Sequence, residues 1–279
     1  MQTSSSKVIV ITGASRGFGR AFALELARRG NRVVATMRNP DDFESLRAQV
    51  PDMDFERLDV TDTANVSASL GAIEARYGRI DVLINNAGYG LYGPVEAFDE
   101  EEVIRQFDTN TMGMWRTCKA VLPGMRKRRD GLIINITSGA ARIPLPLMGM
   151  YGASKAAVHI WSEVLAYEVK RFGIKVTVVE PGAYRTDWQT TSLRVGGTDS
   201  TYSEGVDKAL AAFREHAATM PDPGELAEGV AKLVESTEPR FHNLIAPEGT
   251  EELTNRVLSL TAEQRDDELR GNNPFFPDV

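Results

Sequence analysis

Short apolar runs alternate with longer amphipathic segments along most of this sequence. Strands inside a parallel sheet are covered on both faces, so they are typically continuous apolar runs rich in β-branched residues. Such runs predict strands at residues 7–11, 32–37, 54–58, 80–84, 132–137, 174–179 and 241–245. The segments between them predict helices at residues 20–29, 61–77, 101–125 (one helix or two), 152–172 and 225–235. This alternation predicts an α/β fold: a doubly wound, mostly parallel seven-stranded sheet with helices on both faces.

The region after the sixth predicted strand departs from this alternation. Residues 188–223 are polar and contain Gly196-Gly197 and Pro221-Asp222-Pro223. Because long excursions from a compact domain often cover a binding site, we expect a substrate lid here, with a helix at 202–218. The predicted organisation is one domain over 1–279, with a core at about 7–245, the lid, and a C-terminal helical extension at 246–279. A charged helix is expected at 250–269, and the pattern assigns no structure to 271–279.

Composition narrows the expected partners and location. Of the 279 residues, 42% are hydrophobic and 25% charged, with a net charge of −7, which disfavours nucleic acid and anionic membrane surfaces as partners. Cys118 is the single cysteine, so no internal disulfide can form. His159, His216 and His242 lack the spacing of a metal site, and we expect no metal. The first residues do not resemble a signal peptide and no apolar run is long enough to span a membrane, so a cytoplasmic location is expected.

A glycine-rich turn directly follows the first predicted strand. Gly13, Gly17 and Gly19 lie between the strand at 7–11 and the helix at 20–29. In such a unit the first glycine permits a sharp turn, the second lets the backbone approach a pyrophosphate, and the third lets the helix pack closely against the sheet. The turn therefore predicts a Rossmann fold that binds a dinucleotide at a helix N-terminus. Further candidate contacts in the turn are Ser15, Arg16 and Phe18.

Three residues in the middle of the chain are candidates for proton transfer. Ser138 follows the strand at 132–137, at the carboxyl edge where open α/β sheets bind ligands. Tyr151 and Lys155 are four residues apart in a predicted helix, so their side chains share one face. A free tyrosine has a pKa of about 10, and a nearby ammonium lowers it, which suits a general acid or base near neutral pH. Alone, the tyrosine–lysine pair is equally compatible with an ordinary amphipathic helix.

Several motifs, in one order, carry a resemblance to a known family. They are the glycine turn at 12–19, Asp59, Asn85-Asn86-Ala87-Gly88, Asn110, Ser138, Tyr151, Lys155, Pro181-Gly182 and Thr186. Together they make the chain similar to the short-chain dehydrogenase/reductase family over about residues 7–245. Within it, the segments 35–40 and 86–90 and the extended C-terminal part resemble the subgroup near the 17β-hydroxysteroid dehydrogenases.

The resemblance implies an oxidoreductase with a catalytic tetrad of Asn110, Ser138, Tyr151 and Lys155. It implies that Tyr151 exchanges a proton with the substrate oxygen, which Ser138 orients. It further implies that Lys155 lowers the tyrosine pKa and holds the nicotinamide ribose, while Asn110 holds a water molecule. The cofactor-binding residues implied are Gly13, Ser15, Arg16, Gly17, Phe18, Gly19, Arg38, Asp59, Val60, Asn86, Ala87, Gly88, Tyr151, Lys155, Pro181, Gly182 and Thr186.

Some of these assignments have structural alternatives. Asn110 could satisfy a helix bend, Asp59 and Ser138 could be turn residues, and Thr186 could cap a helix. The family also implies a homodimer or homotetramer. The segment 246–249 departs from the glycine ending of many tetrameric members, which disfavours the tetramer.

The end of the second predicted strand indicates which nucleotide binds. NAD enzymes typically place an acid there to hold the ribose 2′-hydroxyl. Met37 occupies this position, Arg38 follows it, and Arg16 in the glycine turn supplies a second cation. Because a guanidinium matches phosphate oxygens in pairs, NADP(H) is the expected cofactor.

An apolar loop predicts the class of substrate. Residues 143–150, between Ser138 and Tyr151, are mostly apolar. We expect the substrate to be a small molecule, a bulky and mainly apolar ketone, aldehyde or alcohol, because apolar walls bury most of a ligand's surface. The other wall residues expected are Leu91, Tyr92, Tyr184, Trp188 and Leu193. Alternatively, these residues pack against a partner subunit or under the lid.

Two other functions remain open from the sequence. One is a catalytically silent sensor that binds NADP(H) and a protein partner. The other is a 3-oxoacyl reductase, for which the basic run at 126–129 would contact a carrier protein, although cations also suit a helix C-terminus.

Overall fold

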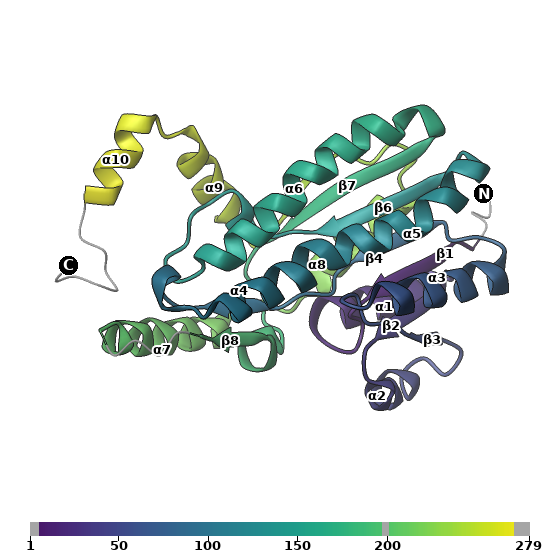
Figure 1. Ribbon diagram of the computed structural model, residues 1–279, viewed down its shortest axis with the longest axis horizontal. Helices are drawn as coiled ribbons and strands as arrows, with labels where there is room; N and C mark the ends of the chain where they lie inside the picture. Colours follow the sequence, from purple (N-terminus) through teal and green to yellow (C-terminus); the bar gives the residue numbers. More distant parts are fainter. Residues whose placement is uncertain (1–5, 197–200, 271–279) are drawn as a thin grey trace.

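The central element is a parallel sheet, and the computed structural model describes residues 6–196 and 201–270 around it (Figure 1). Its strands are β1 (Val8–Thr12), β2 (Arg32–Met37), β3 (Asp54–Arg57), β4 (Val82–Asn85), β6 (Gly131–Ile136), β7 (Ile174–Pro181) and β9 (His242–Ile245). They lie in the order β3-β2-β1-β4-β6-β7-β9, and each neighbouring pair is parallel. The strand order reverses between β1 and β4, where such sheets form a ligand crevice at the carboxyl ends of the strands. The predicted doubly wound α/β fold is confirmed.

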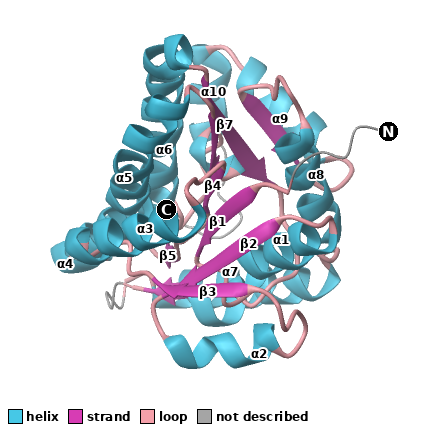
Figure 2. Ribbon diagram, turned by 90° about the vertical axis from the view of Figure 1, so that its right-hand side faces the viewer, coloured by secondary structure: helices cyan, strands magenta, loops and turns pink. Residues whose placement is uncertain are grey.

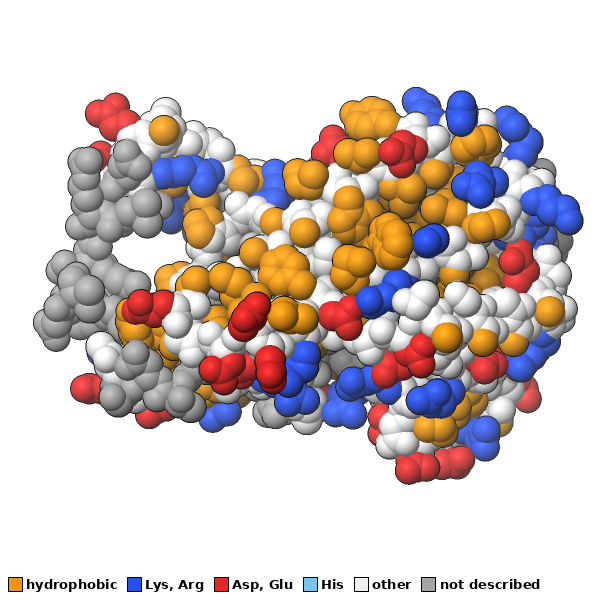
Figure 3. All heavy atoms as spheres, in the orientation of Figure 1, with side chains coloured by type: hydrophobic (Ala, Val, Ile, Leu, Met, Phe, Trp, Pro, Cys, Tyr) orange, Lys and Arg blue, Asp and Glu red, His pale blue; other side chains and the backbone are white. Residues whose placement is uncertain are grey.

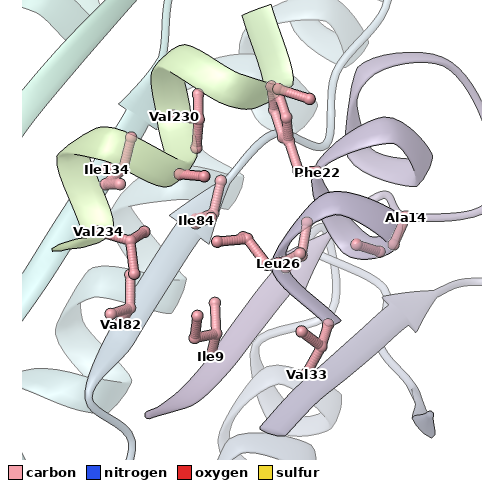
Figure 4. Packing of buried hydrophobic residues seen from close by; sticks show 14 of the residues in the cluster. Ile9, Ala14, Phe22, Leu26, Val33, Val82, Ile84, Ile134, Val230 and Val234 are labelled. Carbon is pink, nitrogen blue, oxygen red and sulfur yellow. The ribbon is translucent and has the colours of Figure 1, made fainter. Parts of the chain in front are cut away.

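Two helical layers cover the sheet, one on each face (Figure 2). Their main helices are α1 (Gly17–Arg28), α8 (Gly224–Glu235), α3 (Thr63–Tyr77), α5 (Gly113–Arg128) and α6 (Gly149–Val169). Alternate side chains of β1 face opposite layers: Ile9 packs with α1 and α8, whereas Val10 packs with α3 and α5. Figure 4 shows Phe22 of α1 and Val230 of α8 in the first of these clusters. The continuous apolar strands seen in the sequence are thus explained by burial on both faces.

The predicted helical segment at 101–125 consists of two helices. They are α4 (Glu100–Phe107) and α5, joined by a π-helical turn at Asp108–Met112. The turn contains Asn110, which is completely buried. Such turns are rare and frequently mark functional sites.

The predicted lid has its own small structural unit. The short strands β5 (Gly90–Tyr92) and β8 (Leu193–Val195) pair in parallel, and α7 (Ser203–Thr219) follows them. The helix predicted at 202–218 is therefore present. Val206 and Leu210 of α7 pack on Tyr92 and Leu147 in a separate apolar cluster. Residues 197–200 of the lid lie outside the described residues.

The C-terminal extension differs from the prediction of one helix at 250–269. It forms α9 (Thr250–Ser259) and α10 (Ala262–Arg270), which lead away from the body of the domain in Figure 1. Leu260 is extended, and Thr261 and Gln264 exchange side-chain-to-backbone hydrogen bonds of 3.2 and 2.9 Å. This capping box starts a new helix and so explains the break. The predicted tail at 271–279 lies outside the described residues.

The remaining elements are short. They are α2 (Glu44–Arg47) and the single turns at Pro40–Phe43, Val95–Ala97, Gly139–Ala141, Lys170–Phe172 and Trp188–Ser192. Across residues 6–196 and 201–270, no helix is both long and apolar enough to cross a membrane.

Candidate active site

The glycine turn is tied to the end of β4 by Thr12 and Asn86. The Thr12 hydroxyl accepts hydrogen bonds of 3.0 Å from the backbone N–H groups of Asn86 and Ala87. The Asn86 amide donates to the carbonyl oxygens of Thr12 and Gly13, also at 3.0 Å. The two strands on either side of the topological switch point are thereby fixed to one another.

The glycines of this turn are required by conformation and by space. Gly13 has φ +67°, and a Cβ there would lie 2.8 Å from Ala87 Cα. A Cβ on Gly19 would lie 2.3 Å from the Gly13 carbonyl oxygen. Gly17 has φ +54° and faces Thr186, whose Cβ would be 3.7 Å from a Cβ at position 17. No side chain therefore projects from the turn at these three positions, and the backbone can be approached closely.

This cradle fits a dinucleotide phosphate. It opens onto the N-terminus of α1, where the partial positive charge of a helix favours anions. The N-cap residue, Arg16, makes no side-chain capping hydrogen bond. Ser15 and Phe18 lie in the same turn and are partly buried, and Phe18 meets Tyr184 edge to face at 6.1 Å between ring centroids. The predicted turn residues therefore lie together at one end of the crevice.

The outer nucleotide-binding candidates lie beyond β2 and β3. Arg38 is exposed directly after β2, and Arg16 lies 3.6 Å from Asp42 in an exposed ion pair. Asp59 accepts hydrogen bonds from the backbone N–H and the hydroxyl of Thr61, at 3.0 and 2.7 Å, so it stabilises a turn. Val60 is buried against Gly113 of α5, which leaves its backbone as the part that can face a ligand.

The proton-transfer candidates converge at the carboxyl end of β6. Ser138 follows the strand and its hydroxyl accepts a hydrogen bond of 3.1 Å from the Ala140 N–H. Tyr151 and Lys155 lie one turn apart on α6, and both are buried. The Ser138 hydroxyl contacts the Tyr151 phenol, and Lys155 Nζ donates to the Ile136 carbonyl oxygen at 2.9 Å. The predicted Ser–Tyr–Lys group is thus assembled by one strand end and one helix face.

The electrostatics of this group differ from the expectation. Burial raises the pKa of Tyr151, and the hydrogen bond from Ser138 opposes that rise. Burial also lowers the pKa of Lys155 to about 8. Loss of solvation outweighs the hydrogen bond with Ser138, so the pKa of Tyr151 lies above its usual value in this structure, whereas the resemblance implies a pKa lowered by Lys155.

Asn110 holds the segment after β4 in place. Its side-chain oxygen accepts from the Tyr89 N–H at 3.0 Å, and its amide donates to the Tyr89 carbonyl at 2.9 Å and to Ser154 at 3.2 Å. A Cβ on Gly88 would lie 2.9 Å from the Asn110 oxygen and 3.5 Å from Lys155 Nζ. Asn110 therefore joins α6, the π-helical turn and the strand end beside Lys155, and its side chain has a structural role.

The candidate cofactor-binding residues after β7 lie across the crevice from the glycine turn, where Thr186 faces Gly17. Pro181 ends β7 beside Ile245, and the Gly182 N–H donates to the Ile245 carbonyl at 3.0 Å. A Cβ on Gly182 would lie 2.4 Å from Ala246 Cβ, so the extension requires glycine here. The Thr186 hydroxyl accepts from the Trp188 N–H at 3.2 Å and so stabilises the start of the lid as well as facing Gly17.

The predicted apolar wall is only partly assembled at the site. Trp188 lies beside Tyr151, with 5.6 Å between ring centroids, and Leu193 is partly buried nearby, against Gly90. Tyr184 instead belongs to the main core, and Leu91 is buried. Tyr92 and Leu147 pack beneath α7, in line with the alternative interpretation that they lie under the lid. Leu91 and Tyr92 lie on β5, and the direction of their side chains depends on the β5–β8 pairing, which the sequence pattern did not reveal.

Two groups of residues near the site were not predicted from the sequence. The first is Phe213 of α7, which lies 6.5 Å from Trp188 between ring centroids. The helical spacing of apolar residues in α7 was the available signal.

The second group surrounds Glu180, which is completely buried, with Arg142 Nη1 at 3.2 Å and His159 Nδ1 at 3.0 Å. Burial alone would raise the pKa of Glu180, but His159 and Arg142 more than offset it, so the pKa is lowered. The signal for Glu180 in the sequence was an acidic residue near the end of a mostly apolar strand.

Known proteins with similar sequences and structures identify the family. Residues 7–194 match the family model for short chain dehydrogenase. The chain is 38% identical over 244 residues to a 3-ketodihydrosphingosine reductase of Bacteroides thetaiotaomicron, covering 86% of this chain and 88% of the relative. A short-chain dehydrogenase from Streptomyces avermitilis shares 33% identity and superimposes with a TM-score of 0.83, covering 98% of this chain and 100% of that chain.

A further solved structure, ElxO with NADP bound, has a TM-score of 0.73 and 25% identity, and covers 86% of this chain and 97% of that chain. The predicted family and the predicted enzyme class, a dehydrogenase or reductase, are confirmed by these matches together with the fold. This chain belongs to the short-chain dehydrogenase family of oxidoreductases.

Proposed function

We propose that the protein is an NADP(H)-dependent oxidoreductase that interconverts a ketone or aldehyde with the alcohol on a bulky, mainly apolar substrate. The observation that carries the proposal is the contact between the Ser138 and Tyr151 hydroxyls at the carboxyl edge of the sheet, with Lys155 one turn along α6. A substrate oxygen at this position meets two hydroxyl groups. The test is consumption of NADPH by the purified chain with a panel of lipophilic ketones.

The predicted cofactor, NADP(H), is confirmed by related structures that hold it, ElxO among them. In this chain the backbone of the Gly13–Gly19 turn would hold the pyrophosphate, and Arg38 would face the 2′-phosphate. When bound, the cofactor supplies or accepts the hydride, while the protein supplies position and electrostatics.

Tyr151 would serve as the general acid in the direction of reduction. Because burial keeps the pKa of Tyr151 high, the phenol is protonated at neutral pH and can give its proton to the carbonyl oxygen. Ser138 would hold that oxygen by a hydrogen bond. Lys155, with a pKa of about 8, is mostly charged at pH 7 and would hold the ribose hydroxyls. These protonation states favour reduction near neutral pH.

The other two functions have less support. A silent sensor does not need a buried Tyr151 in contact with Ser138, yet both are in place. A carrier-protein surface at 126–129 would need free cations. Arg128 instead contacts Glu74 and the Ile80 carbonyl at 2.6 and 2.7 Å, and Arg129 adopts the left-handed conformation that ends α5. Two of the four basic residues at 126–129 thus have a role in the local structure of the domain.

The dependence of kcat/KM on the chain length of the substrate tests whether the substrate site is apolar. Each buried methylene contributes about 0.8 kcal/mol, so kcat/KM in a homologous series of straight-chain ketones is expected to rise at least tenfold over a few carbons. The expectation is supported by Trp188 beside Tyr151, and by the keto substrate in the name of the Bacteroides relative, a 3-ketodihydrosphingosine reductase.

A matched variant makes this test specific. Trp188→Ala is expected to reduce kcat/KM for the long ketones by about tenfold, since it removes a large apolar surface, and to leave the shortest ketone within a factor of about three. A flat response of the wild type to carbon number would show that the wall does not contact substrate.

We further propose that the protein is a homodimer. An outer face formed by α4, the π-helical turn, α5 and α6 exposes large apolar side chains, and Figure 3 shows hydrophobic side chains gathered over these elements. They are Ile104, Met112, Trp115, Ile160, Val164 and Tyr167. A contiguous apolar surface of this kind typically marks a protein interface. A second copy related by a twofold axis would bring the same helices face to face.

Light scattering after size exclusion tests the dimer. We expect twice the chain mass of 30.6 kDa, and the single chain mass for Val164→Asp, because an unpaired buried carboxylate destabilises an interface strongly. The matched control is Val195→Asp, which changes an equally exposed valine in β8 outside this face and should stay dimeric. A monomeric wild type at micromolar concentration, or a dimeric Val164→Asp, would contradict the proposal.

A further inference from the structure

Three potential metal ligands meet on the side of α6 that faces β9. His159 and Glu163 are one turn apart on α6, and His242 begins β9. One ligand atom from each residue lies within 4.8 Å of the other two, and the two imidazole rings are 4.8 Å apart between centroids. The β7–β9 pairing produces this arrangement, since it places His242 beside Val178, two residues before Glu180.

The three ligand residues suit a zinc ion, both in their chemistry and in the freedom of two of their side chains to move. Two imidazoles and one carboxylate are ligands that Zn²⁺ takes at about 2.0–2.2 Å, with a fourth position open to water. Tetrahedral bonds of that length place ligand atoms about 3.4 Å apart, so ligand atoms that lie within 4.8 Å of one another must close by about 1.4 Å at most. His159 is buried, whereas Glu163 is half-buried and His242 is exposed. Closure would come from rotation of Glu163 and His242, whose side chains are the more exposed.

The surroundings of the two histidines favour metal binding. Glu180 Oε1 lies 3.0 Å behind His159 Nδ1, although neither atom makes a hydrogen bond of regular geometry. A carboxylate behind a ligating imidazole fixes its orientation and increases its basicity. The positive charge of Arg142 is paired with Glu180, at 3.2 Å.

We propose that His159, Glu163 and His242 form a zinc site that links β9 to α6, separate from the proposed oxidoreductase chemistry. The expectation of no metal came from the spacing of histidines along the sequence, which does not reveal that the edge strand brings His242 to α6. The site lies on the same helix as Tyr151 and Lys155, but none of its ligands belongs to that group. Its test is therefore independent of enzyme activity.

Titration of the full chain with Zn²⁺, followed by calorimetry and by competition with a chromophoric chelator, tests the site. We expect one Zn²⁺ per chain and a rise in Tm of about 5–10 °C when free zinc is 100 times its Kd. Mg²⁺ at the same concentration should give no shift, because imidazole ligands favour zinc over magnesium.

Variants locate the bound ion. Glu163→Gln and His242→Ala are each expected to weaken binding at least tenfold, while their Tm without zinc stays close to that of the wild type, since both side chains are at least partly exposed. The matched control is His216→Ala on the exposed side of α7, which should bind as the wild type does. The buried Cys118 is not a competing ligand. Absence of stoichiometric binding, or binding unchanged in both ligand variants, would overturn the proposal.

Discussion

Replacing Tyr151 by phenylalanine is expected to lower kcat by about 10²–10⁴-fold while leaving cofactor binding within a factor of about three. The aromatic ring fills a buried site beside Trp188, so phenylalanine keeps the packing. What is lost is the phenol, which contacts Ser138 and is the proton donor in the proposed reaction. Turnover is measured with an apolar ketone and NADPH, and binding by titration of NADPH fluorescence.

Tyr167→Phe provides the matched control for this loss. Tyr167 lies on the same helix and is 75% exposed, on the proposed dimer face and not at the site, so its hydroxyl has no part in the proposed chemistry. Its kcat should equal that of the wild type. If Tyr151→Phe also retains wild-type kcat, the proton donor has been assigned to the wrong residue.

Arg38→Ala is expected to reduce kcat/KM for NADPH by about 10- to 100-fold and to leave the value for NADH nearly unchanged. A hydrogen bond to a charged group contributes about 1.5–3 kcal/mol, which corresponds to that range, and NADH lacks the phosphate. Arg38 is exposed directly after β2 and forms no salt bridge with any other described residue, whereas Arg16 is close to Asp42. Arg38 is therefore the cation more available to a 2′-phosphate.

Two comparisons make the Arg38 result specific. Arg47→Ala removes an exposed arginine of α2 that is paired with Glu44, and it should change neither value. The wild type itself should prefer NADPH. Equal kcat/KM values for the two cofactors in the wild type, or a parallel loss with both in Arg38→Ala, would contradict the role of this residue.

The sheet was predictable because burial on both faces leaves a simple signal in the sequence. The strand at 32–37 was predicted with the bounds that the structure has, since its β-branched run begins and ends beside polar residues. The helix break at Leu260 was missed, although Thr261 and Gln264 have the spacing of a capping box. The β5–β8 pair was not predicted, because three-residue strands carry too few positions for an alternating pattern.

For the candidate site, the sequence indicated which residues meet, but not how burial and neighbouring groups shift their pKa values. Ser138, Tyr151 and Lys155 were recognisable from their order and from helical spacing. The direction of the Tyr151 pKa shift depends on burial, and the sequence gives no measure of it. Likewise, Glu180 of β7, His159 of α6 and His242 of β9 come together only through the tertiary fold. Local patterns therefore identify the chemistry-bearing residues, whereas packing decides their protonation and their neighbours.

The proposed hydride transfer is tested most directly by following deuterium from NADPH deuterated at the transferable C4 position to an apolar ketone. We expect the wild-type enzyme to place deuterium on the carbinol carbon of the alcohol at a rate that matches NADPH consumption. Tyr151→Phe, with cofactor bound, should do so at least about 100-fold more slowly. Product without deuterium at that carbon, or equal rates in the two proteins, would show that the proposed reaction or its proton donor is wrong.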